Sequence, residues 1–127
     1  MADQPTLIDI TGLALEVGLP IDWAETGITT WLEPKPAPHL KSVPVFFTRL
    51  LWDRLCSAWP GEVAHREGAM RVLGEAREAL IARVIAQHAW RTWLRVEFDS
   101  DEYQLWLIVD HGYSEGIAIG FGQGDFW

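Results

Sequence analysis

The spacing of the hydrophobic residues changes from a helical period to an extended period near Arg91. From about Glu67 to His88, hydrophobic residues recur every three or four positions, which predicts one long amphipathic helix. These residues are Val72, Leu73, Ala76, Leu80, Ile81, Val84 and Ile85. After Arg91, polar and apolar positions alternate, as is typical of a half-buried strand. The alternating rows are Trp93, Arg95 and Glu97 against Leu94, Val96 and Phe98. The apolar stripe of a helix and the apolar face of a strand each need another element to cover them. We therefore expect the helix to pack on this strand.

Two further strands are expected downstream. A turn at Ser100–Glu102 precedes a strand over Tyr103–Val109, and a turn at Gly112–Gly116 precedes a strand over Ile117–Phe121. Three consecutive strands joined by short turns predict an antiparallel meander. The sequence therefore predicts a single α+β globular domain over residues 1–127. In it, two or three helices, one of them long, pack on a C-terminal antiparallel three-stranded meander.

Two shorter helices are expected in the N-terminal half. The first covers Ile10 to Val17 with Asp9 as its cap, and the second follows Thr48, a good N-cap residue, and ends near Trp59. Between them, Glu33–Lys41 contains three prolines and is expected to be a connecting loop.

Two residues in the helices carry specific packing expectations. Trp52 belongs to an apolar stripe of its helix, so we expect it in the core. Gly74 lies inside the long helix, where glycine costs about 1 kcal/mol relative to alanine. We therefore expect it to allow the close approach of another element.

The charges are segregated along the chain. All ten Lys and Arg residues lie between Lys35 and Arg95, whereas residues 1–34 and 97–127 contain carboxylates and no Lys or Arg. The net charge is −8. Either the basic middle of the chain neutralises the acidic segments within the fold, or the acidic segments leave a negative face for a basic partner. The negative charge argues against direct binding of nucleic acid, because that affinity comes from Lys and Arg on phosphates.

No residue set has the spacing of a catalytic or metal site. The four histidines are scattered, Cys56 lies alone on an apolar helix, and the glycine-rich stretch 120–124 follows a strand but precedes no helix. We therefore expect no cofactor, no metal ion and no enzymatic activity. A small enzyme that uses Asp110 and His111 as an acid–base pair is a less favoured alternative.

Two stretches carry a resemblance to known proteins. Leu13–Trp23 (LALEVGLPIDW) ends a helix with glycine and continues with a hydrophobic–Asp–hydrophobic step. Val43–Leu55 (VPVFFTRLLWDRL) leads an apolar strand into Thr-Arg and a helix that carries tryptophan. Together they resemble a family of small uncharacterised proteins of bacterial plasmids and phages, in which a V-A-[LV]-T-R-x-[LV]-W segment recurs. The resemblance implies a setting among the accessory genes of mobile elements. Its motifs are packing motifs, so it assigns no active residue.

The favoured functional hypothesis is a counter-defence inhibitor, similar in general character to anti-CRISPR proteins. Grooves of Lys and Arg built for a polyanion also accept suitably spaced carboxylates. The expected partner is a basic surface of a host protein, such as a CRISPR–Cas effector. The candidate partner-binding residues are Asp99, Asp101, Glu102, Asp110, Glu115 and Trp127. The first three are favoured because they share one predicted hairpin turn, whereas the next two bracket the turn at the opposite end of the meander.

The alternative is a protein–protein interaction module that uses an exposed aromatic patch. The chain has eight tryptophans, and tryptophan is enriched at interface hot spots. Salt separates the two hypotheses, because an electrostatic mimic loses its partner as ionic strength rises and an aromatic patch does not.

The sequence also contains no pattern typical of a signal peptide and no run of about 20 apolar residues that could span a bilayer. We therefore expect a cytoplasmic protein without membrane contact.

Overall fold

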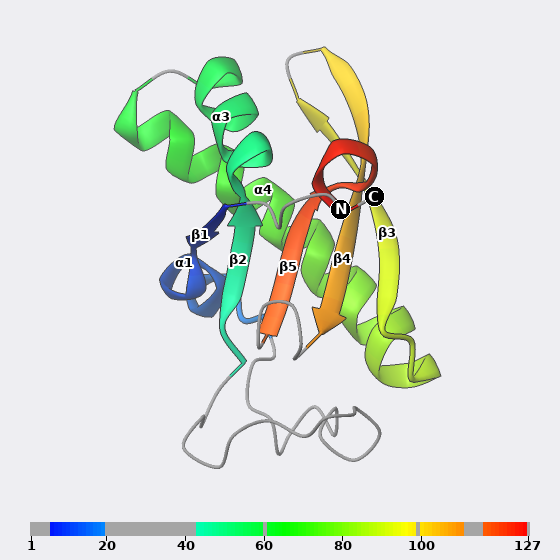
Figure 1. Ribbon diagram of the computed structural model, residues 1–127. Helices are drawn as coiled ribbons and strands as arrows, with labels where there is room; N and C mark the ends of the chain where they lie inside the picture. Colours follow the sequence, from blue (N-terminus) through cyan, green and yellow to red (C-terminus); the bar gives the residue numbers. More distant parts are fainter. Residues whose placement is uncertain (1–5, 20–42, 60, 99, 111–115, 127) are drawn as a thin grey trace.

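The computed structural model describes residues 6–19, 43–59, 61–98, 100–110 and 116–126, and Figure 1 shows how their helices and strands are arranged. In chain order the elements are β1 (Leu7–Asp9), α1 (Thr11–Glu16), β2 (Val45–Thr48), α3 (Arg49–Ala58), α4 (Glu62–Ala79), the π-helical turn η2 (Leu80–Ile85), β3 (Arg91–Phe98), β4 (Asp101–Asp110), β5 (Gly116–Phe121) and the π-helical turn η3 (Gly122–Phe126). The protein is α+β, with α4 crossing behind the sheet in the view of Figure 1.

The five strands form one mixed sheet in the order β1-β2-β5-β4-β3. β2 runs parallel to β5, with Val45 opposite Ile117 and Phe47 opposite Ile119. The other neighbouring strands are antiparallel. The predicted architecture, a three-stranded antiparallel meander, is therefore wrong, because the sheet extends beyond β5 to the two N-terminal strands β2 and β1. Strands of three and four residues are too short to show a hydrophobic period, so the sequence did not reveal their pairing.

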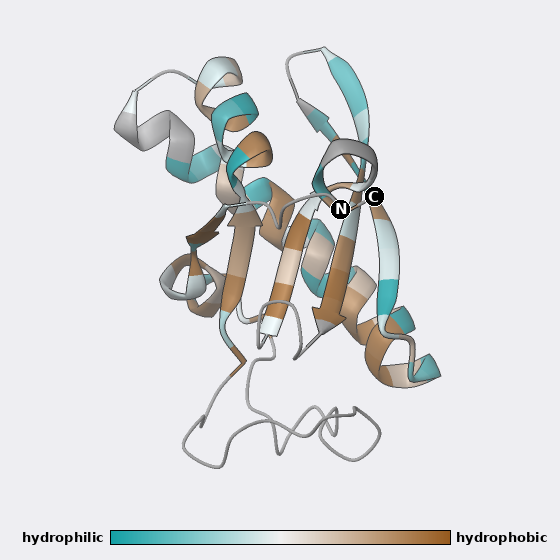
Figure 2. Cartoon of the chain, viewed as in Figure 1, coloured by the Kyte–Doolittle hydropathy of each residue, from teal (hydrophilic) through white to brown (hydrophobic). Residues whose placement is uncertain are grey.

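The long helix covers the inner face of this sheet. Of the seven residues predicted for its apolar stripe, Val72, Leu73, Ala76, Leu80 and Val84 are fully buried, whereas Ile85 is half-buried and Ile81 is exposed. Leu94 and Val96 of β3 belong to the same hydrophobic core. The predicted packing of the helix on this strand is confirmed. Figure 2 shows hydrophobic residues gathered on β2, β4 and β5, whereas the tip of the hairpin between β3 and β4 is hydrophilic.

The two shorter helices differ in detail from the prediction. Thr48 caps α3 as expected, because its Oγ1 accepts a hydrogen bond of 3.3 Å from the backbone N–H of Leu51. The buried residues of α3 are Leu51 and Leu55, whereas Trp52 is only half-buried and packs against the edge of the core. The expectation for Trp52 was wrong because one step along a helix rotates the side chain by about 100° from its neighbour. The proline-containing loop Glu33–Lys41 lies outside the described residues.

The close approach expected at Gly74 occurs instead at Gly68. A Cβ atom added at Gly74 would meet no atom within 4 Å, whereas one added at Gly68 would lie 2.6 Å from Cε3 of Trp59. The prediction for Gly74 is therefore wrong. The spacing pattern could not reveal this, because Trp59 precedes α4 and reaches Gly68 only after the chain turns at Gly61.

We expect Gly74→Ala to stabilise the protein by about 1 kcal/mol, because alanine is the better helix former and open space receives the new methyl group. Its matched variant is Gly68→Ala in the same helix. There, overpacking against the Trp59 ring costs about 1–3 kcal/mol, which outweighs the gain in helix propensity. Urea unfolding of both variants tests the pair, and equal shifts of the same sign would contradict the assignment.

Candidate functional site

The structure does not place all six predicted partner-binding residues. Outside the described residues lie Asp99, Glu115 and Trp127. The backbone of Asp110 is opposite Gly116, at the far end of β4 from Asp101. Asp110 therefore does not join the hairpin-tip carboxylates, as its predicted position at the opposite end implied.

Asp101 and Glu102 are exposed, but they begin strand β4 rather than forming part of a turn. Asp101 lies opposite Phe98, and Glu102 lies opposite Glu97. Because successive residues of a strand point to opposite faces of the sheet, the two side chains diverge. The predicted trio therefore cannot present three carboxylates in one direction.

The carboxylate of Glu102 also has a cation nearby. Its Oε1 lies 3.5 Å from Nε of Arg95, and both side chains are exposed. An ion pair of this kind contributes little to stability, but it reduces the negative charge that the hairpin tip can offer a basic partner.

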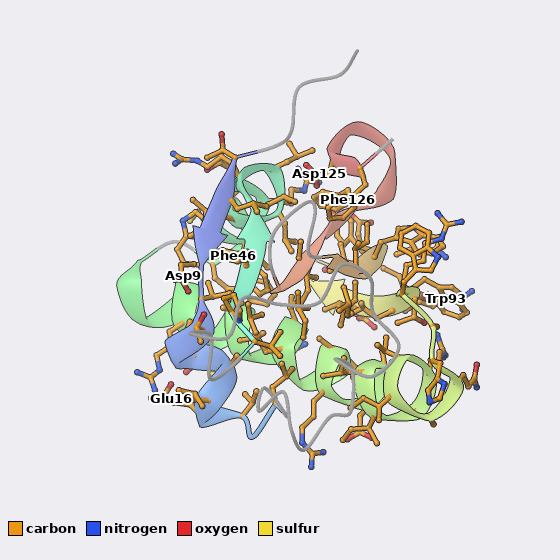
Figure 3. All side chains as sticks on the ribbon, turned by 60° about the horizontal axis from the view of Figure 1, so that its bottom comes forward. Asp9, Glu16, Phe46, Trp93, Asp125 and Phe126 are labelled. Carbon is orange, nitrogen blue, oxygen red and sulfur yellow. The ribbon has the colours of Figure 1, made fainter. Side chains whose placement is uncertain are left out.

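A second cluster lies on the face of the sheet opposite α4. We call it the tryptophan–arginine surface. It consists of Arg91, Trp93, Arg95 and Trp106, together with Arg83 at the sheet edge and Trp90 immediately before β3, whose ring stacks on Arg91. Trp93 lies directly opposite Trp106 in the β3–β4 pair. It is adjacent to Leu94, whose side chain is buried in the core under α4, so Trp93 points to the opposite face, away from the helix. Figure 3 shows Trp93 projecting at the margin of the molecule.

The rings and guanidinium groups of this surface stack on one another. The guanidinium carbon of Arg91 lies 4.7 Å from the ring centroid of Trp90 and 5.6 Å from that of Trp106. Trp93 has Arg83 at 4.5 Å and Arg95 at 5.3 Å. Exposed cation–π contacts of this kind are worth about 0.5–1 kcal/mol each. They restrain the side chains, so less conformational entropy remains to be lost when a partner binds.

Much of this surface is accessible. Trp90 is 50% exposed and Trp93 is 36% exposed, whereas tryptophan is usually among the more buried residues. Tryptophan and arginine are also the two residue types most enriched at binding hot spots. The arrangement can therefore offer flat apolar area together with donors for carboxylates or phosphates.

Sequence reasoning missed these residues as a site, although a signal was present. Trp93 shares its alternating row with Arg91, Arg95 and Glu97. Charged residues of a half-buried strand point to solvent, so the tryptophan among them had to lie on the outer face as well.

The described residues do not suggest catalytic chemistry at Cys56. The thiol is half-buried, and burial, together with the nearby carboxylate of Asp53, raises its pKa above the ordinary value. A raised pKa keeps the thiol protonated at neutral pH and makes it a poor nucleophile. Within the described part of the chain, no three His, Cys, Asp or Glu side chains gather as a metal-binding group.

Comparisons with protein-family models, with curated proteins and with solved structures found no match for this chain. The resemblance to plasmid and phage accessory proteins therefore stays a prediction. Among the described helices, none is both long enough and apolar enough to cross a membrane.

Proposed function

We propose that this chain is a non-enzymatic binding protein that contacts a protein partner through the tryptophan–arginine surface. The observation that carries the proposal is the exposure of Trp93 on the sheet face that α4 leaves uncovered and of Trp90 just before β3, with arginine side chains stacked on both rings. An exposed aromatic cluster supported in this way is typical of an interaction surface.

The chemistry of the surface also favours a class of partner. The rings offer apolar contact area, and the arginines offer donors that match carboxylates. A partner segment that carries apolar side chains beside one or two acidic residues satisfies both. A long polyanion fits less well, because the whole chain carries a net charge of −8.

The second candidate is the acidic counter-defence inhibitor, acting on a basic surface such as that of a CRISPR–Cas effector. The exposed carboxylates of Glu97, Asp101 and Glu102 at one end of the β3–β4 hairpin favour it. Against it stand the opposite directions of Asp101 and Glu102 and the ion pair that Glu102 makes with Arg95. The two candidates therefore assign partner binding to different residues of the same hairpin: Trp93 in the first, and Asp101 and Glu102 in the second.

We expect Trp93→Ala to weaken partner binding by about 30-fold or more, the effect of truncating a hot-spot tryptophan. The partner is first captured from cells that carry the gene and identified by mass spectrometry. Its affinity for purified variants is then measured by calorimetry at several salt concentrations. Binding through the aromatic surface should depend only weakly on salt.

Two controls accompany this measurement. Leu15→Ala removes an equally apolar, exposed side chain from α1, far from the surface in the sheet order, and should leave binding unchanged. The double reversal Asp101→Lys and Glu102→Lys should also leave it nearly unchanged. Loss of binding in the double reversal, with full binding by Trp93→Ala, would reject the proposal and favour the acidic inhibitor.

A further inference from the structure

Strand β3 forms an edge of the sheet and is eight residues long. Within the residues that the structure describes, no strand pairs with its outer side. A long edge strand presents backbone N–H and C=O groups that can pair with another chain. The outward groups of β3 therefore determine which strand can pair with it.

The backbone groups that point outward belong to the odd-numbered residues of β3. The N–H of Val109 donates to the carbonyl oxygen of Trp90 at 2.8 Å, so Trp90 and every second residue after it face β4. Two arginines confirm this direction from outside the strand. Nη1 of Arg83 donates to the carbonyl oxygen of Trp93 at 2.8 Å, and Nη1 of Arg71 donates to that of Glu97 at 3.4 Å.

We infer that the outer edge of β3 binds β3 of a second copy of this chain, antiparallel and centred on Leu94. In that register each outward residue lies opposite a residue with which it interacts favourably, and each such pair occurs twice because of the two-fold axis. Arg91 lies opposite Glu97 of the second copy, and Trp93 lies opposite Arg95 of the second copy. Opposite charges and an aromatic–cation pair directly across a strand pair are both favourable.

Neighbouring registers with the same outward residues are worse. Centring the pair on Trp93 places Arg91 opposite Arg95 of the second copy, and centring it on Arg95 places that arginine opposite itself. Like charges directly opposite one another are destabilising. The charge pattern of the strand therefore selects the register centred on Leu94, which uses the whole strand.

The space beside the edge also fits a further strand. A cleft of about 320 Å³ lies between β3 and the helical segment formed by α4 and η2. Its lining combines charged residues (Glu75, Glu78, Arg83 and Arg95) with Ala79, Ala82, Trp93 and Leu94. The inward row of an added β3 consists of Thr92, Leu94 and Val96, which would lie against the alanines and Leu94 of this lining, with the charged residues around them. The two alanines leave room for Leu94 of the second copy next to Leu94 of the first.

The arginine contacts on the edge set a cost for this pairing. Arg83 and Arg71 must leave the carbonyl oxygens of Trp93 and Glu97, which then accept backbone N–H groups of the second copy. Because charged side chains on an edge limit unselective pairing, only a strand with matching outward residues gains enough to displace them. Pairing would join two five-stranded sheets and bring two tryptophan–arginine surfaces side by side.

The test is a charge swap across the proposed two-fold axis, measured by sedimentation equilibrium over a wide range of protein concentration. We expect the unmodified chain to dimerise. Glu97→Arg places two arginines opposite each other at each end and should weaken the dimer at least tenfold, and Arg91→Glu should do the same. The double variant Arg91→Glu with Glu97→Arg restores opposite charges and should return the dimerisation constant to within about threefold.

Glu67→Arg, an exposed reversal on α4, controls for the change in net charge. Far-ultraviolet circular dichroism and thermal unfolding confirm that each variant is folded. Hydrogen exchange provides a second readout, because the outward amides of Trp93 and Arg95 should become more protected as concentration rises. A chain that stays monomeric at the highest concentration, or a dimer that the double variant does not restore, would overturn the inference. Partner binding by Trp93 has its own test, the Trp93→Ala measurement, so a failure of dimerisation and a failure of partner binding are distinguished.

Discussion

Truncation of Phe47 to alanine is expected to lower the free energy of unfolding by about 3–5 kcal/mol. Phe47 is fully buried in the middle of β2, opposite Ile8 of β1 and Ile119 of β5. It therefore fills the part of the core where the N-terminal strands join the C-terminal strands. Because a domain of this size is stable by only about 5–15 kcal/mol in total, the loss would be a large fraction of its stability.

The neighbouring residue provides the matched control for Phe47. Phe46 points to the opposite face of β2 and is only half-buried, so Phe46→Ala should cost less than half as much. Urea unfolding followed by tryptophan fluorescence measures both variants. Equal losses, or a larger loss for Phe46, would show that the inner and outer faces of β2 have been assigned the wrong way round.

The sequence predicted best those elements whose hydrophobic residues repeat many times. The helix predicted near 67–88 and the strand near 93–98 each contain several periods, and the structure contains α4 with η2 and β3 at these places. β1 and β2 contain three and four residues, so no period could be recognised in them. The parallel pairing of β2 with β5 joins residues about 70 positions apart, and no local pattern encodes such a contact.

The candidate site was harder to predict for a related reason. Local charge density pointed to Asp99, Asp101 and Glu102, but directions of side chains depend on where the turn ends and the strand begins. Once β4 begins at Asp101, its first two side chains point to opposite faces. Trp93 lies on the face of the sheet that α4 does not cover, and the charged residues of its row indicate this position. The alternation of β3 contained this information, whereas the overall net charge did not.

The turn η3 after β5 contains a buried carboxylate, Asp125, which Figure 3 labels. Asp125 is only 8% exposed, and its Oδ2 accepts hydrogen bonds from Oγ1 of Thr48 at 2.7 Å and from the backbone N–H of Phe121 at 2.8 Å. Gly120 lies directly beside this contact. An added Cβ there would be 2.5 Å from Cγ2 of Thr48 and 2.7 Å from Oδ2 of Asp125. Gly120 therefore allows close packing around this carboxylate.

We expect Asp125→Ala to cost about 3 kcal/mol, because it leaves a buried hydroxyl and a partly buried backbone N–H without their charged acceptor. Asp125→Asn keeps an acceptor oxygen and should cost less. Thr48→Val preserves side-chain shape but removes both the donor to Asp125 and the acceptor that caps α3. The loss of the cap is common to both halves of a double-mutant cycle with Asp125→Ala, so the cycle isolates the contact between the two side chains. We expect the two losses to be smaller in combination than their sum. Urea unfolding of the four proteins measures the coupling. Strict additivity would mean that the two side chains do not stabilise one another, and that the turn η3 is held by its apolar contacts instead.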